Sequence, residues 1–558
     1  MERLRNSVKR YYWGRLIRYF LTCWLILSTS LQVVMAAPTG GVVDLTDPRN
    51  GNATIFENAG FDELTTLVDV ATQRTIINWA GLDTAGGDPG VRETLAFTQT
   101  LADSAVLNRV SGGMTYFNGD LTAPGMRIFM VNPAGIIFGG GPTGARVNVS
   151  QLVASGLNMS NDAFHAVLDD VSNEMVFEGG YGEVKNYGLI EATDSVHLIG
   201  RKAWNTGTIR ANEGSKLIVM AAGEKVYIAQ DGSNVRVELL VEPADVDPDV
   251  RNASNLQAHN GTIVLAAGDT FSGAISRAIL NVGIIEASGG TVTARAGQVN
   301  NNGKIIVSGS ENGGTVNLAG SESVSIGLDG SEVAGSIEAN AGTEGNGGSV
   351  TIETDDLFEM GADSLITARG GSVSGNGGHV KITSETFVIA GDIDASPAST
   401  DFEPGTLMID SSSVTIANGL NPADDGDIPA TPAENTLYEV DIENLSDKGT
   451  SVVVNADDKI TVKDIADGTI KGGFGNIELY ATGPFSSVTF DDNTNTIRTT
   501  LGDIAIGAGS EGINIGNLIT GDAELGATPG RIILGTTQAG DLDPGDITTG
   551  DLIIEGGS

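Results

Sequence analysis

A short phrase, Asn-x-Gly-x-Ile, recurs in the middle of the chain and constrains the fold more strongly than any other feature of the sequence. It appears as NYGLIEA, NTGTIRA, NVGIIEA and NNGKIIV, and the copies within each pair are 19 and 20 residues apart. A fixed period of this length is typical of repeat proteins, in which one small unit stacks on the next. The corner residues are Asn186 and Gly188, Asn205 and Gly207, Asn281 and Gly283, and Asn301 and Gly303.

The residue types in each phrase predict a tight corner followed by a short strand. Asn and Gly tolerate positive φ angles, which favour tight corners. The residues after each corner alternate between apolar and polar, as in a strand with one buried face, and helical periodicity is nearly absent from about residue 180 onward. One such unit cannot bury its apolar face alone, but it can do so when stacked on a copy of itself. The expected fold is therefore a parallel β-solenoid.

Two other all-β architectures compete with the solenoid. Propeller blades would repeat at about 40 to 50 residues and carry aromatic markers. Sandwiches would need heavier core residues than these strands offer. Only 5% of the chain is aromatic, and 77 of its 558 residues are glycine. This composition favours a core of Val, Ile, Leu and Ala with closely spaced turns, as in a solenoid.

The coil pattern divides the chain into segments because it weakens in two regions that are richer in Pro and Asp. We expect a signal peptide at residues 1–36, a secretion domain that opens the β-helix at 37–230, a loop or extra-helical insertion at 231–260, β-helix repeats at 261–396, a Pro/Asp-rich linker at 397–440, and degenerate β-solenoid repeats at 441–558.

The first 36 residues have the three parts of an export signal. A basic segment ends at Arg18, the apolar stretch YFLTCWLILSTSLQVVM follows, and small residues close it. The predicted cleavage lies between Ala36 and Ala37. The competing interpretation is an uncleaved membrane anchor, although polar residues dilute the apolar run below that of a typical spanning helix. The only cysteine, Cys23, lies in this segment, so the mature chain would depend on backbone pairing and apolar burial rather than on disulfides.

The charge of the chain limits its partners. The formal net charge is −40, and it becomes −45 without the first 36 residues, which hold six basic residues and one acidic residue. The overall field of so acidic a chain repels nucleic acid and anionic lipid, so neither is expected as a partner.

A search for catalytic and metal-binding residues gives no candidate. The four histidines, His165, His197, His259 and His379, are solitary, and no Gly-x-Ser-x-Gly elbow occurs. Two Gly-x-Gly-x-x-Gly matches are not followed by a helix pattern, as a nucleotide site would require. We therefore predict no catalytic residue, no metal and no cofactor. An enzyme built on a β-helix would need clustered Asp, Arg or Lys on one face of adjacent coils, and no such set appears at coil spacing.

Residues 40–225 contain ordered motifs that differ from the simple coil phrases. They are RTIINWAGLD, LAFTQTLADSAVLNRVSGG, RIFMVNPAGIIFGGGPTGARVNVSQLVASGLNMSNDAF and MVFEGG. In order and approximate spacing, these motifs resemble the haemagglutination-activity, or secretion, domain of filamentous-haemagglutinin-like proteins, the exported partners of two-partner secretion systems. Several ordered motifs together are far more specific than one short pattern.

The resemblance implies a route, a fold and partners. Such proteins reach the periplasm through a Sec signal, and the periplasmic transport-associated domains of a dedicated outer-membrane β-barrel transporter recognise their N-terminal domain. The chain crosses this pore unfolded and folds outside into a right-handed β-helix, usually serving as an adhesin. The resemblance thus implies a secreted or cell-surface protein with an N-terminal β-rich capping domain. A host, cell-surface or glycan receptor is also implied, but its identity does not follow.

The family's Asn-Pro secretion motif is carried here by Asn132, Pro133, Gly135 and Ile136. Many members have Asn-Pro-Asn-Gly-Ile, and this chain has Ala134 in place of the second Asn. The substitution leaves the turn intact and affects only contacts peculiar to the second amide. The competing interpretation is a plain solenoid corner, because Asn-Pro and glycine runs mark turns in many proteins.

Two other functions stay open at this point. One is a carbohydrate-active β-helix enzyme. The other is the N-terminal part of a contact-dependent toxin, whose activity would lie in a further C-terminal domain if Ser558 is a truncation.

Overall fold

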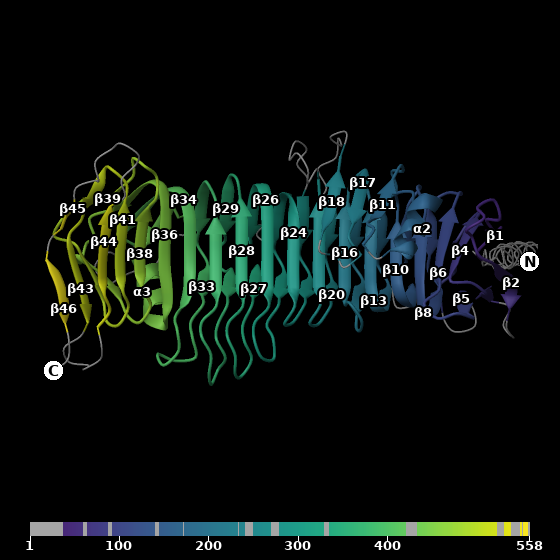
Figure 1. The fold of residues 1–558 in the computed structure, drawn as a ribbon, viewed down its shortest axis with the longest axis horizontal. Coiled ribbons are helices and arrows are strands. Elements are labelled where there is room, and N and C mark those ends of the chain that lie inside the picture. The colour runs from purple at the N-terminus through teal and green to yellow at the C-terminus, as the bar shows by residue number, and fades with distance from the viewer. Residues whose placement is uncertain are drawn as a thin grey trace, which may run out of the picture.

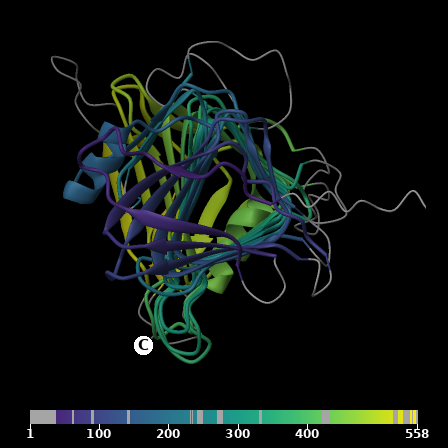
Figure 2. The same ribbon diagram turned by 90° about the vertical axis from the view of Figure 1, so that its right-hand side faces the viewer.

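The chain forms a long rod of stacked coils, with its two ends at opposite ends of the rod (Figure 1). The structure is a computed structural model, and it describes residues 37–59, 64–87, 92–139, 144–170, 172–230, 232, 234–239, 249–268, 278–328, 334–419, 432–521, 529–536, 547–549 and 551–555. The predicted signal peptide, including Ala36, lies outside the described residues. Figure 2 looks along the rod and shows successive coils superposed around one enclosed interior.

Each coil contributes strands to three parallel ladders that run along the rod. In the first ladder each short strand ends at a coil corner. Its strands are β7 (Thr115–Phe117), β9 (Ile136–Phe138), β12 (Val184–Asn186), β14 (Ala203–Asn205), β19 (Val250–Asn252), β22 (Ala278–Asn281), β29 (Leu357–Met360), β32 (Thr386–Ile389), β35 (Thr436–Tyr438), β39 (Ser487–Phe490), β42 (Gly512–Asn514) and β45 (Ile547–Thr548).

The second ladder follows the first across that corner. It consists of β3 (Thr65–Val70), β5 (Thr94–Gln99), β15 (Thr208–Ala211), β20 (Asn255–Gln257), β23 (Ile284–Glu286), β25 (Lys304–Ile306), β27 (Ser336–Glu338), β30 (Leu365–Thr367) and β33 (Asp392–Asp394). A separate parallel sheet continues toward the C-terminal end with β37 (Thr469–Gly472), β40 (Thr496–Thr499), β43 (Asn517–Gly521) and β46 (Leu552–Glu555).

The third ladder completes the coil. Its strands are β4 (Arg74–Trp79), β6 (Ala105–Val110), β16 (Leu217–Ala222), β21 (Thr262–Ala267), β28 (Ser349–Thr354), β31 (His379–Thr383), β38 (Ile477–Ala481), β41 (Ile504–Ala508) and β44 (Ile532–Thr536). Longer strands bend and pair in two ladders. These are β8 (Asp120–Val131), β10 (Arg146–Ser155), β13 (Leu189–Gly200), β24 (Thr291–Asn301), β26 (Thr315–Ile326), β34 (Gly405–Ala417) and β36 (Thr450–Val462).

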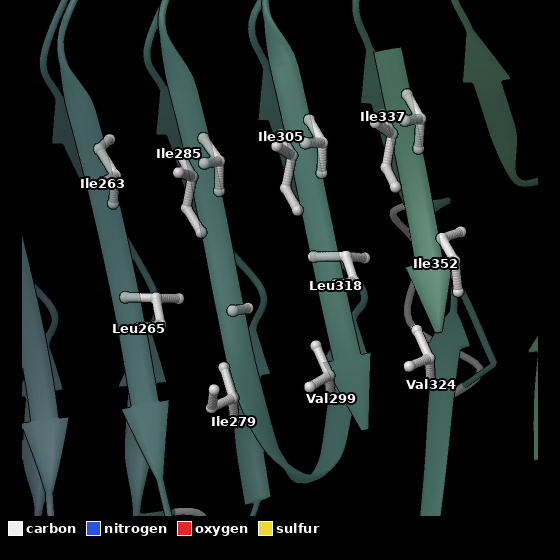
Figure 3. Packing of buried hydrophobic residues seen from close by; sticks show 14 of the residues in the cluster. Ile263, Leu265, Ile279, Ile285, Val299, Ile305, Leu318, Val324, Ile337 and Ile352 are labelled. Carbon is white, nitrogen blue, oxygen red and sulfur yellow. The ribbon is translucent and has the colours of Figure 1, made fainter. Parts of the chain in front are cut away.

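The interior is filled by rows of aliphatic side chains. Ile285, Ile305 and Ile337 occupy equivalent positions on successive strands of the second ladder and are buried (Figure 3). Many strands alternate buried and partly exposed residues, since neighbouring side chains point to opposite faces of a strand. Stacking therefore removes apolar surface from water that no single coil could bury, and this burial is the main stabilising contribution.

Antiparallel strands close the N-terminal end of the rod. The strand β1 (Val42–Val43) pairs with β4, and β2 (Ala53–Ala59) pairs with β3. An open solenoid end would present unpaired backbone groups to other chains. These strands cover that edge, so the predicted N-terminal β-rich cap is present.

A second apolar cluster lies outside the coils, over the third ladder. The helix α2 (Asn161–Asp169) begins at Ser160, whose hydroxyl accepts a hydrogen bond from the Ala163 backbone N–H at 3.1 Å. It buries Phe164 against Phe129, with ring centroids 5.3 Å apart. Next to it, β11 (Met175–Glu178), β17 (Lys225–Ile228) and β18 (Val235–Glu238) form a three-stranded antiparallel sheet.

The structure changes two predicted segment boundaries. Residues 231–260 were expected to be a loop or an extra-helical insertion. The strand β18 does lie outside the coils, in the external sheet, but the coils resume within this range at β19 and β20. Residues 397–440 are not a plain linker. They contain β34, which pairs along its length with β36, and β35, which pairs with β34. Pro and Asp mark the projecting connections here, but alternating apolar residues between them still form coil strands.

A second helix was not expected from the sequence. The helix α3 (Glu439–Lys448) contacts both β33 and β37, so it occupies the place of a strand where the second ladder changes sheets. Gly449 ends it with a φ of 89°, the left-handed conformation that glycine adopts at helix ends. In the part of the chain that the structure describes, no helix is long and apolar enough to span a membrane. The predicted fold class, an all-β parallel β-helix with an N-terminal β-rich cap, is confirmed.

Candidate functional site

The Asn-Pro motif forms the corner between the third and first ladders in one N-terminal coil. Asn132 follows β8, and Ile136 begins β9. Asn132 is fully buried, and Ile136 is 1% exposed. The motif therefore lies inside the wall of the rod, and Ala134 is its exposed member.

The Asn132 side chain uses all its main hydrogen-bonding groups within the protein. Its amide nitrogen donates to the Gly113 carbonyl at 2.8 Å and to the Thr115 hydroxyl at 2.9 Å. Its amide oxygen accepts from the Ala134 backbone N–H at 2.9 Å. The Gly135 N–H donates to the Asn132 carbonyl at 2.8 Å, which closes the turn. This side chain thus holds a corner of its own coil against the preceding coil.

Gly135 is required by this corner for two reasons. Its φ is 112°, a conformation that residues with a Cβ rarely adopt. A Cβ there would also lie 3.0 Å from the Glu183 carbonyl oxygen of the next coil. Ala134 is exposed, and the turn contact at this position comes from its backbone N–H rather than from its side chain.

The recurring corner asparagines form one continuous ladder of amide hydrogen bonds. Each amide nitrogen donates to the amide oxygen on the next coil, at 2.9, 2.9, 2.9 and 2.7 Å in order along the rod. The members, all buried, are Asn186, Asn205, Asn252, Asn281 and Asn301. The last amide donates to the Ser336 carbonyl at 3.1 Å. The structure thus brings together all four asparagines that the repeat phrase identified.

Asn252 is the ladder member that the repeat phrase missed. It lies in the stretch RNASNLQ, where Ala253 and Ser254 replace the x-Gly of the phrase. A signal was present, since Leu256 is in register with the buried Ile209 of the previous coil. The distance of 47 residues from Asn205 hid this signal, because the external sheet is inserted between the two coils.

The glycines of the phrase serve a different purpose from the one expected. The glycines at 188, 207, 283 and 303 do not have positive φ angles. Their role is close approach between coils. A Cβ on Gly207 would lie 2.1 Å from the Gly188 carbonyl oxygen, and a Cβ on Gly303 would lie 2.2 Å from that of Gly283. The expectation of positive φ at these positions was wrong, and stacking of neighbouring backbones is the reason for glycine.

The four histidines are not brought together. His165 is buried in α2, with its Nε2 atom 3.3 Å from an Asp47 carboxylate oxygen. His197 is buried in the third ladder between Val153 and Val219. Among the described residues, no group of three or more His, Cys, Asp or Glu side chains could hold a metal ion.

The burial of His197 predicts a pH dependence of stability. Burial lowers the pKa of His197 from 6.5 to about 4, against a weaker opposing effect of Asp194. The unfolded chain therefore binds a proton before the folded chain does, and stability falls as pH drops from about 6.5 toward 4. At 1.36 kcal/mol per pKa unit, the loss from this group is about 2 kcal/mol at pH 5.

Replacing His197 with leucine should remove that part of the acid sensitivity. The measurement is urea unfolding at pH 7 and at pH 5, with the exposed His379→Gln as the matched control. The control should keep the wild-type difference between the two pH values. An unchanged difference in His197→Leu would show that this histidine is not responsible.

A polar groove corrects one statement made from the sequence, that no set of charged residues lies on one face of adjacent coils. Glu385, Asp410 and Asp457 line an open groove of about 660 Å³ together with several hydroxyl groups. Lys381 Nζ lies 3.0 Å from one oxygen of Asp410, and the Asn455 amide donates to the other at 2.6 Å. Unequal coil lengths hid this grouping in the sequence. The central carboxylate is paired on both oxygens, and this arrangement assigns no chemistry to the groove.

Comparison with known proteins finds one partial sequence relative and a similar fold. No family model matches the chain. Over 206 residues it is 29% identical to the heme/hemopexin-binding protein of Haemophilus influenzae, a match that spans 35% of this chain and 21% of that protein. The fold is similar to the crystal structure of the HMW1 secretion domain from Haemophilus influenzae, with a TM-score of 0.55 and 21% identity, over 75% of this chain and 100% of that domain.

The capped, stacked coils with a buried Asn-Pro corner share the β-helical fold of the HMW1 secretion domain. Together with the ordered motifs of residues 40–225 and the partial sequence match, this fold makes the chain similar to exoproteins of the two-partner secretion type.

Proposed function

We propose that the chain is exported by a two-partner secretion system and acts at the cell surface or in the medium as an adhesin. Its N-terminal domain would be recognised by an outer-membrane β-barrel transporter with periplasmic transport-associated domains. The observation that carries this proposal is the Asn-Pro corner built into the first coils of a fold that covers the whole HMW1 secretion domain. In this proposal, export begins with a signal peptide cleaved between Ala36 and Ala37.

The shape of the chain supports an adhesive function. A rod of stacked coils offers a long lateral surface held by backbone pairing (Figure 1). We infer that this surface binds a partner without catalysis. The heme/hemopexin ligand named for the relative is not carried over, because the match spans 21% of that protein.

Export should depend on the partner transporter. Coexpression of the full chain with a β-barrel transporter that carries periplasmic transport-associated domains should release it into the medium, and omission of the transporter should lower release at least tenfold. The measurement is the ratio of released to cell-associated chain. A periplasmic protein of the same host should show no change in either strain. Equal release with and without the transporter would contradict the proposed route.

A further inference from the structure

One outward-facing row near the Asn-Pro corner differs in chemistry from the rest of this acidic chain. In five short strands of the first ladder, the middle residue points out of the coil, because both its neighbours are buried. The strands β7, β9, β12, β14 and β19 pair in register, so these middle residues form one row. In order, the row reads Tyr116, Ile137, Lys185, Trp204 and Arg251.

Within the row, the Trp204 ring lies between two cationic side chains. Lys185 Nζ lies 4.4 Å from the centroid of the Trp204 ring, and the guanidinium carbon of Arg251 lies 5.9 Å from it. The Lys202 ammonium is 5.3 Å from the same centroid. These distances are within the range of cation–π attraction, which holds the cations beside the ring face.

The row continues into the corner that carries the secretion motif. The Tyr181 backbone N–H donates to the Pro133 carbonyl at 3.3 Å, and its side chain is 72% exposed. The Arg201 guanidinium carbon lies 5.7 Å from the centroid of the Tyr181 ring. Tyr116, at the other end of the row, is 51% exposed. We call the basic–aromatic face the surface made by Tyr116, Tyr181, Lys185, Arg201, Trp204 and Arg251.

Along this row, the run of cations ends at Arg251. The next positions of the same row, Leu280, Asn300 and Ser325, are uncharged, and Glu359 follows them. Two of these cations have a carboxylate nearby: Glu183 pairs with Lys185, and a Glu224 oxygen lies 4.0 Å from an Arg201 nitrogen. A local group of cations on a chain of net charge −40 would complement an anionic partner, which the remaining surface would repel.

We propose that the basic–aromatic face binds an acidic polysaccharide whose sugars carry carboxylates. Arg and Lys pair with carboxylates through charge-assisted hydrogen bonds, and exposed aromatic rings offer flat apolar platforms for the C–H face of a sugar ring. A polymer with about one carboxylate per sugar suits this surface better than a densely charged polyanion, because the overall negative field penalises dense charge. The proposal rests on the proposed export, since the folded face meets such a ligand outside the cell.

Binding of the purified full chain to polygalacturonate tests this proposal. Wild type should bind polygalacturonate and should not bind neutral dextran of similar length. The double variant Arg201→Ser, Arg251→Ser should raise the Kd at least tenfold. Tyr181→Ser, which keeps the net charge and changes a mostly exposed side chain, should raise it about threefold or more.

The matched control is Lys463→Ser, Arg531→Ser, which removes the same charge from exposed sites elsewhere on the rod. Its Kd should stay within twofold of wild type, and thermal unfolding should be alike for all variants. Equal losses in both double variants, tighter binding to duplex DNA than to polygalacturonate, or no binding by wild type would overturn the proposal. The binding assay contains no transporter. A failure to bind polygalacturonate would therefore leave the proposed transporter-dependent export unaffected, and the two proposals can fail separately.

Discussion

Replacing Asn205 with leucine is expected to lower the free energy of unfolding by about 4 kcal/mol, one of the two largest effects we predict. Asn205 is in the middle of the asparagine ladder, where it accepts from the Asn186 amide and donates to the Asn252 amide oxygen, both at 2.9 Å. Leucine would leave a buried donor and a buried acceptor without these partners. Each such orphaned group costs about 1–3 kcal/mol. Urea unfolding followed by circular dichroism measures the loss.

The matched control for Asn205→Leu is Asn301→Leu at the end of the ladder. Asn301 accepts from Asn281 and donates to a backbone carbonyl, so its replacement orphans one side-chain amide instead of two. We expect about half the loss. Hydrogen exchange should show that the opened coils surround Asn205, because in a solenoid each coil contacts mainly its neighbours. If both variants unfold like wild type, the ladder is not a significant source of stability.

The repeating coils could be predicted from the sequence because stacking imposes the same requirement at each corner. A buried asparagine recurs because its side-chain amide can donate to one coil and accept from another at the same position. The same stacking explains where sequence reasoning failed. The phrase records which residues recur, but it does not distinguish a glycine needed for positive φ from one needed for close approach, as at Gly207 and Gly303.

The same difficulty applies to a second set of asparagines, in the loops that project from the middle of the rod. The Asn346 backbone N–H donates to the Asn312 amide oxygen at 2.9 Å, and that of Asn376 donates to Asn346 at 2.9 Å. The GNGG phrases thus build stacked loops as well as strand corners. Their period alone could not separate the two uses.

The two helices were missed for different physical reasons. The nine residues of α2 have a helix start signal in Ser160, but their stability depends on packing Phe164 against distant coils. The α3 segment has acidic residues in its first turn, Lys448 in its last turn and Gly449 after it, which are local helix signals. The sequence analysis did not predict α3, because it spans the boundary between the segment expected to be a linker and the segment expected to be degenerate coils.

The candidate site was only partly accessible from sequence. The resemblance identified Asn132 as part of the secretion motif, and the hydrogen bonds of its side chain became visible only when coils were stacked. The basic–aromatic face was not found at all. Lys185, Trp204 and Arg251 are separated by 19 and 47 residues, and they meet because the strands that carry them pair in register.

The second large effect is expected for Asn132→Asp, which should reduce release of the chain at least tenfold. The carboxylate cannot donate to the Gly113 carbonyl or the Thr115 hydroxyl, so a buried negative charge would face the Gly113 carbonyl oxygen. The corner would open, and the first coils would lose the contact that fixes their register. The measurements are the released fraction in the presence of the transporter and the protease resistance of residues 92–230.

The neighbouring Ala134 supplies the control for Asn132→Asp. Ala134→Asn introduces, at an exposed position, the residue that many filamentous-haemagglutinin-like proteins carry, so release and protease resistance should stay at wild-type levels. Because Asn132 is buried, the folded corner cannot present its side chain to a transporter, and a structural function requires that release and protease resistance fall together. Loss of release with wild-type protease resistance would instead mean that the transporter recognises Asn132 in the unfolded chain. Wild-type release by Asn132→Asp would show that the Asn132 side chain is not needed for export.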